Sequence, residues 1–180
     1  LAASANYCFA LCWASMELRD DRSVVLAAVK DCLRIDQTLD VLEYASQGLR
    51  GDRAFMLELL RLYCERKAEV EGEAKAAGGR TSAMTHMSAE YGGLARYASA
   101  ELMADRDFVL AAVAAAPKSL LFAAEGLRAD REIVTCAVAG NVDLLEDVAA
   151  AFRSDREVVM LALTEGCKAV DMTTPIGPRW

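Results

Sequence analysis

The chain has 180 residues, of which 54% are hydrophobic and only 7% aromatic, so its core must be built mainly from alanine, valine and leucine. Its formal net charge of −7 argues against nucleic acid as a main partner. The longest apolar run, Phe108 to Ala116, is about half as long as a membrane-spanning helix requires, and no signal or transit peptide is recognisable.

The chain opens with an apolar stretch over residues 5–18, which we expect to form a helix. Leu18, Asp21 and Arg22 then form a motif, Leu-x-x-Asp-Arg, directly before a second apolar run at 22–33. Because aspartate is a preferred helix N-cap, the motif predicts that a new helix begins at Asp21. The motif and the two short helices on either side of it form one copy of a possible repeat.

The motif returns four more times, once with Phe152 in place of the leucine, so we expect a repeat protein. The predicted helix caps are Asp21, Asp52, Asp105, Asp130 and Asp155. The last three lie 25 residues apart, which sets the basic period. Helices this short are marginal alone in water, so the copies must stabilise one another by stacking.

The second copy should contain a first helix over residues 39–48 and a second helix that begins at Arg53. This second helix meets no breaker before Gly72 and is predicted to continue to about Ala77. Its later half is charged nearly all round, which is typical of a solvated projecting helix or of an arm that reaches a partner. The candidate partner-binding residues on it are Glu69, Glu73 and Lys75.

Residues 66–93 depart from the repeat and are predicted to be an insertion, which holds the only histidine, His86, beside Met87. Methionine sulfur and imidazole are ligands for Cu(I), but no carboxylate or thiolate accompanies them in sequence. We therefore interpret His86 as a loop residue and assign no metal ligand. Insertions on repeat arrays often lie on the binding face, so His86 and Met87 remain candidate partner-binding residues.

The most regular copies occupy residues 94–166, where helices are expected to stop at Pro117, Gly140 and Gly166. Residues 171–180 contain two prolines and a glycine and are predicted to form an extended tail. In this tail Ile176, Arg179 and Trp180 are a candidate docking anchor, with a frayed terminus as the alternative.

Aligned on the motif, the copies follow the pattern Leu-x-aromatic-Ala-Ser-x-x-Leu-x-x-Asp-Arg-x-x-Val-x-x-Ala-Val. This pattern resembles a family of tandem short helical repeats in microbial proteins, classed as a domain of unknown function. Residues 11–29 match best, whereas the copy at 42–60 departs in its second helix and the copy at 145–163 has Asp147 at the aromatic position. The resemblance implies short helix pairs and carries no known activity or catalytic residue.

Two columns of side chains have both a structural and a functional interpretation. The aromatic column Trp13, Tyr44, Tyr97 and Phe122 is interpreted as a packing layer rather than a peptide-binding stripe, because alanine and leucine columns flank it. The arginines of the motif, with a second row of arginines three residues earlier, are interpreted as partners of the capping aspartates rather than as an anion site.

The six cysteines show no framework spacing, and most lie in apolar stretches, so we expect reduced, buried thiols. Such thiols suit a reducing compartment, either the cytoplasm or an organelle interior. The first residue is Leu1, which fits a processed N-terminus or a fragment.

These features predict an all-α protein, a right-handed α-solenoid-like array of short helix pairs with one long projecting helix and an insertion. One repeat domain should cover residues 1–170, followed by the tail at 171–180. The expected function is a non-catalytic scaffold or structural subunit with no cofactor, whose partners are other protein subunits. It should not span a membrane, although docking to a membrane complex stays open. The alternatives are a peripheral subunit of an organellar, for example plastid, complex and a regulatory repeat region of a longer enzyme.

Overall fold

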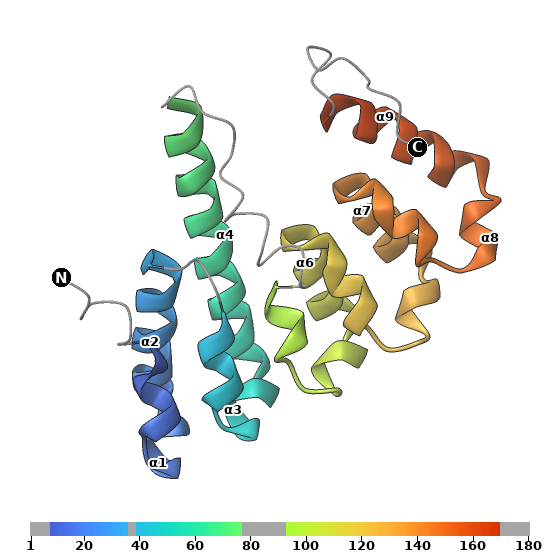
Figure 1. The fold of residues 1–180 in the computed structure, drawn as a ribbon. Helices are drawn as coiled ribbons and strands as arrows, with labels where there is room; N and C mark the ends of the chain where they lie inside the picture. Colours follow the sequence, from blue (N-terminus) through green and yellow to red (C-terminus); the bar gives the residue numbers. More distant parts are fainter. Residues whose placement is uncertain (1–7, 36–38, 77–92, 170–180) are drawn as a thin grey trace, which may run out of the picture.

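The computed structural model describes residues 8–35, 39–76 and 93–169, and within these ranges every regular element is a helix. The prediction of an all-α protein is therefore confirmed for the described residues. Figure 1 shows the elements following one another in chain order, with α1 and α2 at one end of the molecule and α9 at the other.

Five α-helices begin directly after the aspartate of each motif. They are α2 (Arg22–Ile35), α4 (Arg53–Ala76), α6 (Arg106–Ala115), α7 (Arg131–Gly140) and α9 (Arg156–Ala169). At α6, Oδ1 of Asp105 accepts hydrogen bonds from the backbone N–H groups of Asp107 at 3.0 Å and Phe108 at 3.1 Å. The carboxylates of Asp21, Asp52, Asp130 and Asp155 accept equivalent bonds. Each aspartate thus satisfies two of the N–H groups that the first turn leaves without partners.

The segment before each motif is not one helix, so the continuous helices predicted at 5–18 and 39–48 are wrong. Each segment consists of a 3₁₀ helix, a break and a short second turn. The pairs are η1 (Cys8–Trp13) and α1 (Met16–Arg19), η2 (Asp40–Tyr44) and α3 (Gln47–Gly51), η3 (Gly93–Arg96) and η4 (Leu102–Ala104), η5 (Pro117–Phe122) and η6 (Leu127–Ala129), and η7 (Val142–Glu146) and α8 (Ala150–Arg153).

The break falls on the Ala-Ser pair of the pattern. Ser46 has φ −59° and ψ 152°, an extended conformation, and its Oγ accepts a hydrogen bond from the N–H of Leu49 at 3.1 Å. Ser15 and Ser99 bind the N–H groups of Leu18 and Leu102 in the same way. Since serine is a strong N-cap that offers the backbone an alternative to helix, it begins a new turn here instead of continuing the old one.

The long helix α4 is confirmed, and it runs through Gly72 without a break for about 36 Å. Side chains of its charged half donate hydrogen bonds to both neighbouring helices. Nε of Arg66 donates to the carbonyl of Leu33 near the end of α2 at 3.4 Å, and Nζ of Lys67 donates to the carbonyl of Ala115 at the end of α6 at 3.1 Å. Cations at helix C-termini are favourable because they meet carbonyls without partners and the negative end of the helix dipole. Only the last turns of α4 extend past α2 and α6 in Figure 1.

The core runs along the whole row of helices and contains few aromatic side chains. Phe55 and Phe108 are its largest fully buried side chains, and aliphatic residues such as Leu42, Ile133 and Leu144 fill most of the rest. The chain re-enters the described part at Gly93, whose φ of 52° lies in the left-handed region that glycine adopts without strain. Of the predicted insertion at 66–93, residues 66–76 belong to α4, and 77–92 lie outside the described residues.

The cysteines do not share one environment. Cys32 is buried and Cys12 and Cys136 are half-buried, but Cys64 on α4 is exposed, so the prediction of burial is wrong there. Partial burial raises the pKa of the Cys136 thiol, which favours the neutral form. The side chains of Cys8 and Cys167 lie outside the described residues.

Candidate functional site

The most regular polar feature of the molecule is an edge along which the arginine of one copy pairs with the acids of the next. Nε of Arg106 lies 2.9 Å from Oδ2 of Asp130, and its Nη2 lies 2.5 Å from Oε2 of Glu132. Arg131 makes the same two contacts with Asp155 and Glu157, both at 2.6 Å. We call this row of contacts the arginine–acid edge.

The first two copies are joined by variants of this contact. Nη2 of Arg22 lies 2.6 Å from Glu58, Nη1 lies 4.0 Å from Asp52, and the guanidinium lies 5.4 Å from the centre of the Phe55 ring. Nε of Arg53 lies 2.8 Å from Oδ2 of Asp105. The geometry supports the interpretation that the motif residues pair with one another, but each arginine reaches the cap of the following copy rather than its own.

Three of the capping carboxylates, those of Asp105, Asp130 and Asp155, are stabilised as anions. The Arg106 guanidinium is the first cause that lowers the pKa of Asp130, and Arg131 does the same for Asp155. For Asp105 the first cause is the N–H of Phe108, followed by Arg53. Because each of these three carboxylates is bound by a helix terminus and by a cation, it is held charged and is poorly suited to exchange protons near neutral pH.

The second row of arginines, three residues earlier in four of the five copies, does not form one site. Arg19 donates to the backbone carbonyls of Ala14 and Cys12, and Nε of Arg50 is buried without a hydrogen-bond partner among the described residues. Arg128 and Arg153 are exposed. The geometry therefore does not favour a shared anion site along this row.

A backbone hydrogen bond also joins consecutive copies at the break described above. The N–H of Ser46 donates to the carbonyl of Arg19 at 3.0 Å, Ser99 to Arg50 at 3.0 Å, and Ala124 to Met103 at 2.8 Å. The extended backbone at the break leaves the N–H group of its second residue outside any helix, so this group can bond to the preceding copy. The small side chains at the break allow the two backbones to approach. This explains the alanine and serine columns of the pattern, which spacing alone assigned to a helix face.

The aromatic column divides into buried and exposed members. Tyr97 is buried and donates its hydroxyl to Oδ1 of Asp40 at 2.5 Å, and Tyr44 is half-buried. Trp13 is 90% exposed and Phe122 is 40% exposed, so the packing interpretation is wrong for these two. The segments that carry them are 3₁₀ helices with three residues per turn, and faces deduced from α-helical spacing do not hold there.

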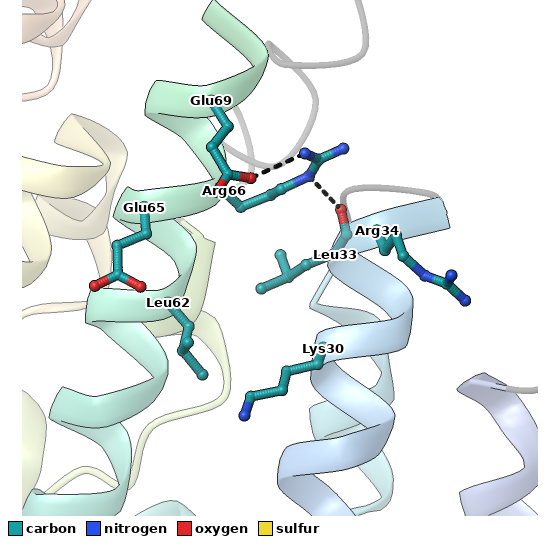
Figure 2. Close-up of a pocket in the computed structure, with 7 residues that line it drawn as sticks. All are labelled: Lys30, Leu33, Arg34, Leu62, Glu65, Arg66 and Glu69. Carbon is teal, nitrogen blue, oxygen red and sulfur yellow. Dashed lines mark hydrogen bonds and ion pairs between the residues drawn. The ribbon is translucent and has the colours of Figure 1, made fainter.

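A shallow pocket of about 300 Å³ lies between α2 and α4 and is shown in Figure 2. Its walls are Leu33 and Leu62, and Arg66 crosses it to reach Glu69 at 3.0 Å and the carbonyl of Leu33. Lys30 extends into the same gap, whereas Glu65 and Arg34 turn away from it (Figure 2). With its one bridging guanidinium already engaged, the pocket offers a partner mainly the Lys30 amine and two leucine side chains.

The structure does not gather the predicted partner-binding residues into one site. Glu69 and Glu73 are exposed on α4, and Lys75 lies in α4 with its side chain outside the described residues. His86, Met87, Ile176, Arg179 and Trp180 also lie outside the described residues. Among the described residues no helix is long and apolar enough to cross a membrane. In the same ranges no three histidine, cysteine or acidic side chains are grouped as a metal site would require.

Sequence reasoning did not identify which apolar residues are exposed at the two ends of the row. Trp13, Met16 and Leu18 are exposed at one end, and Met160 and Leu163 are exposed at the other. The sequence offers no signal for this difference, because position 18 is a leucine like its equivalents. In the structure Leu18 is 46% exposed, while the equivalent Leu49 and Leu102 are 8% and 6% exposed.

The comparisons with known proteins give one family match, which carries no known activity. The model of a family described as a domain of unknown function (DUF4116) matches residues 105–149. No curated protein and no solved structure matches the chain. The matched region runs from Asp105, the cap of α6, to Ala149, just after η7. This part of the chain, which contains the whole motif at 127–131 and only the Asp-Arg end of the motif at 102–106, is similar to that family.

Proposed function

We propose that the chain is a non-catalytic protein of five stacked copies, a right-handed solenoid-like array with a period of about 25 residues. In this proposal it serves as an interaction scaffold or a structural subunit of a larger assembly. We also propose that the similarity to DUF4116 at 105–149 extends to the other copies, as tandem repeats of one unit.

One observation carries the proposal: the motif residues are used to join neighbouring copies. Four successive arginines, from Arg22 to Arg131, contact an acid at the start of the following copy or in its first turns. A backbone bond of constant position accompanies three of these contacts. Side chains that are already paired in this way build a surface, and they are poorly placed to bind and convert a substrate.

The surface that is left for partners extends along the molecule and carries both charged and apolar side chains. The exposed acids of the last turns of α4, including Glu69 and Glu73, form one candidate contact, and the shallow pocket between α2 and α4 lies beside it. Extended surfaces of this kind are how repeat proteins bind other proteins. The organellar complex and the regulatory region of a longer enzyme remain alternatives within this binding class.

The experiment is copurification from the native source with three baits of the whole chain. The first is unchanged, the second carries Glu69→Lys with Glu73→Lys, and the third carries Glu125→Lys with Asp143→Lys as a matched reversal of two exposed acids elsewhere. We expect stoichiometric protein partners with the first and third baits and their loss with the second. If no protein copurifies in stoichiometric amount with any bait, the scaffold proposal fails.

A fourth bait that ends at residue 170 tests the tail separately. Loss of partners with unchanged helical circular dichroism would assign docking to 171–180. A loss of helical signal in any variant would show that the change acts on folding, and that bait would then not count as a test of binding.

A further inference from the structure

Equivalent positions on the helices after the motif differ in exposure at the two ends of the row. We number them from the capping aspartate of each copy. In α4, α6 and α7 the third, fourth, seventh and eighth residues after the cap are all buried. They are Phe55, Met56, Leu59 and Leu60; Phe108, Val109, Ala112 and Val113; and Ile133, Val134, Ala137 and Val138.

The first copy has only half of this set buried. In α2 the fourth and eighth residues, Val25 and Val29, are fully buried, but the third and seventh, Val24 and Ala28, are only half-buried. Besides the short helices α1, η1 and η2, the α2 helix packs against α4 of the following copy, so we assign its fully buried fourth and eighth positions to that side. The third and seventh positions then face a preceding copy.

The last copy shows the opposite pattern. In α9 the third and seventh residues, Val158 and Ala162, are 0% and 1% exposed, whereas Val159 is half-buried and Leu163 is 56% exposed. The α9 helix packs against α7 of the preceding copy, so we assign its buried third and seventh positions to that side. The two end surfaces are therefore the two halves of the junction that the interior copies repeat.

The two ends also carry charged side chains of opposite sign at the positions that pair in the interior junctions. Arg156 is exposed and pairs with no acid in the described part of the chain, although the equivalent Arg131 contacts two. At the other end, Asp21 is bound by Ser23 and by the N–H of Val24, which lower its pKa, and no described arginine reaches it. Figure 1 places these residues' helices, α9 and α2, at opposite ends of the molecule, so they cannot meet within one chain.

We infer that the chain associates head to tail with a second copy of itself. The α9 surface formed by Arg156, Val159 and Leu163 receives the surface of the partner formed by Leu18, Asp21, Val24 and Ala28. The contact repeats the interior junction, with Arg156 of one molecule beside Asp21 of the next. Such a heterologous contact leaves one free surface at each end of the pair and so continues into open chains or a closed ring.

The inference rests on the proposed stacking of copies, and a different experiment tests it. The purified whole chain is examined by sedimentation velocity and equilibrium over a wide range of concentration. We expect the mean mass to rise with concentration, less steeply at high salt because the exposed ion pair is screened. A single monomeric species up to about 1 mM would overturn the inference.

Single-surface variants establish the polarity of the contact. Leu163→Glu blocks the α9 surface, and Leu18→Glu blocks the other; both side chains are exposed, so the monomer should still fold. Each variant alone should pair at least tenfold more weakly than the unchanged chain, whereas an equimolar mixture should form 1:1 pairs that grow no further. Leu121→Glu, at an interior leucine that is 42% exposed, is the matched control and should associate like the unchanged chain.

The outcomes separate this inference from the proposed function. If the mixture of the two blocked variants stays monomeric, or if Leu163→Glu associates as the unchanged chain does, the head-to-tail contact is wrong. A chain that captures other subunits in the copurification experiment but does not self-associate overturns only the head-to-tail contact. A chain that self-associates and captures nothing overturns only the scaffold proposal.

Discussion

Nε of Arg53 lies 2.8 Å from Oδ2 of Asp105, although 52 residues separate them along the chain. The equivalent pair Arg106 and Asp130 is 24 residues apart and has a distance of 2.9 Å. The arginine–aspartate distance is thus nearly the same whether 24 or 52 residues separate the two partners. Since the entropy of closing a loop grows only slowly with length, an insertion between copies is tolerated when the junction itself is unchanged.

Removing one arginine of the edge should loosen the copy that follows it. Arg131→Gln takes away the contacts with Asp155 and Glu157 that hold the start of α9. These pairs are solvent-exposed and individually weak, so we expect faster amide hydrogen exchange in α9, by a few-fold, and little change in the melting temperature. Exchange measured by mass spectrometry on peptides from α6 and α9 would show the difference.

Arg128→Gln is the control, because Arg128 is exposed and contacts no acid among the described residues. It removes the same charge three residues away. Equal effects of the two changes on α9 would mean that net charge, and not the junction, governs exchange there.

Two glycines on helices should respond in opposite ways to alanine. A Cβ on Gly140, at the end of α7, would overlap Cγ of Pro117, in a ring that cannot move aside easily. Gly140→Ala should therefore cost about 1–3 kcal/mol in the free energy of unfolding. At Gly72 in α4 nothing lies within 4 Å, so Gly72→Ala should stabilise by about 0.5–1 kcal/mol through helix propensity.

Urea denaturation of the two variants measures both values. If Gly140→Ala proved as stabilising as Gly72→Ala, the close approach of α7 to the proline that begins η5 would be refuted.

The helices after the motif could be predicted from the sequence because their signals are local. An aspartate followed by an apolar run determines where a helix begins, and the absence of a breaker predicted the length of α4. The partners of Arg66 and Lys67 could not be predicted, since the carbonyls of Leu33 and Ala115 are brought to α4 by packing. The direction of the arginine–acid edge, from one copy to the next, was likewise a matter of tertiary geometry.

The segments before the motif were mispredicted for a physical reason. Leucine and alanine at spacings of three, four and seven are compatible with an α-helix, and they are also compatible with a 3₁₀ turn followed by a break. At Ser46 the outcome was decided by two contacts outside the helical pattern, the Oγ cap on Leu49 and the N–H bond to Arg19 of the preceding copy.

The aromatic column gives a stability test of this correction. Phe122 is 40% exposed in η5, whereas Phe108 in α6 is fully buried. Phe108→Ala should cost about 3–5 kcal/mol, because it leaves a large cavity, and Phe122→Ala should cost less than about 1 kcal/mol. Chemical denaturation compares them directly. Similar losses for the two would restore the prediction that the aromatic column is a packing layer.

The hydrogen bond between Tyr97 and Asp40 should make the protein sensitive to alkali. Burial, with the nearby Asp40 as the next cause, raises the pKa of Tyr97 above its usual value of about 10. Above that pH the unfolded chain ionises this phenol and the folded chain does not, so stability is lost as pH rises. Tyr97→Phe should cost about 1 kcal/mol at neutral pH but reduce the alkaline loss.

Denaturation midpoints at neutral pH and near pH 11 measure this difference. An alkaline loss in Tyr97→Phe equal to that of the unchanged chain would show that Tyr97 is not the group responsible.

The capping aspartates should determine how the protein unfolds in acid. Asp21, Asp105, Asp130 and Asp155 all have a pKa lowered from the ordinary value, by helix N–H groups, hydroxyls or arginines. A lowered pKa means that the unfolded state takes up protons first as the pH falls. The stability they contribute is therefore complete well above pH 4 and is lost progressively as the pH falls through about 4 and below.

Asp130→Asn removes the negative charge of the cap but keeps its hydrogen-bond acceptor. Asparagine still accepts the N–H bonds of the first turn, but it no longer pairs electrostatically with Arg106, and it cannot be protonated in this range. We expect a lower melting temperature at neutral pH and a shallower decline toward acid, so that the two proteins converge near pH 2–3. Asp143→Asn, an exposed carboxylate without an ion pair in the described residues, changes the net charge equally and should keep the full acid decline. If Asp130→Asn declined as steeply as the unchanged chain, protonation of this cap would not contribute to acid unfolding.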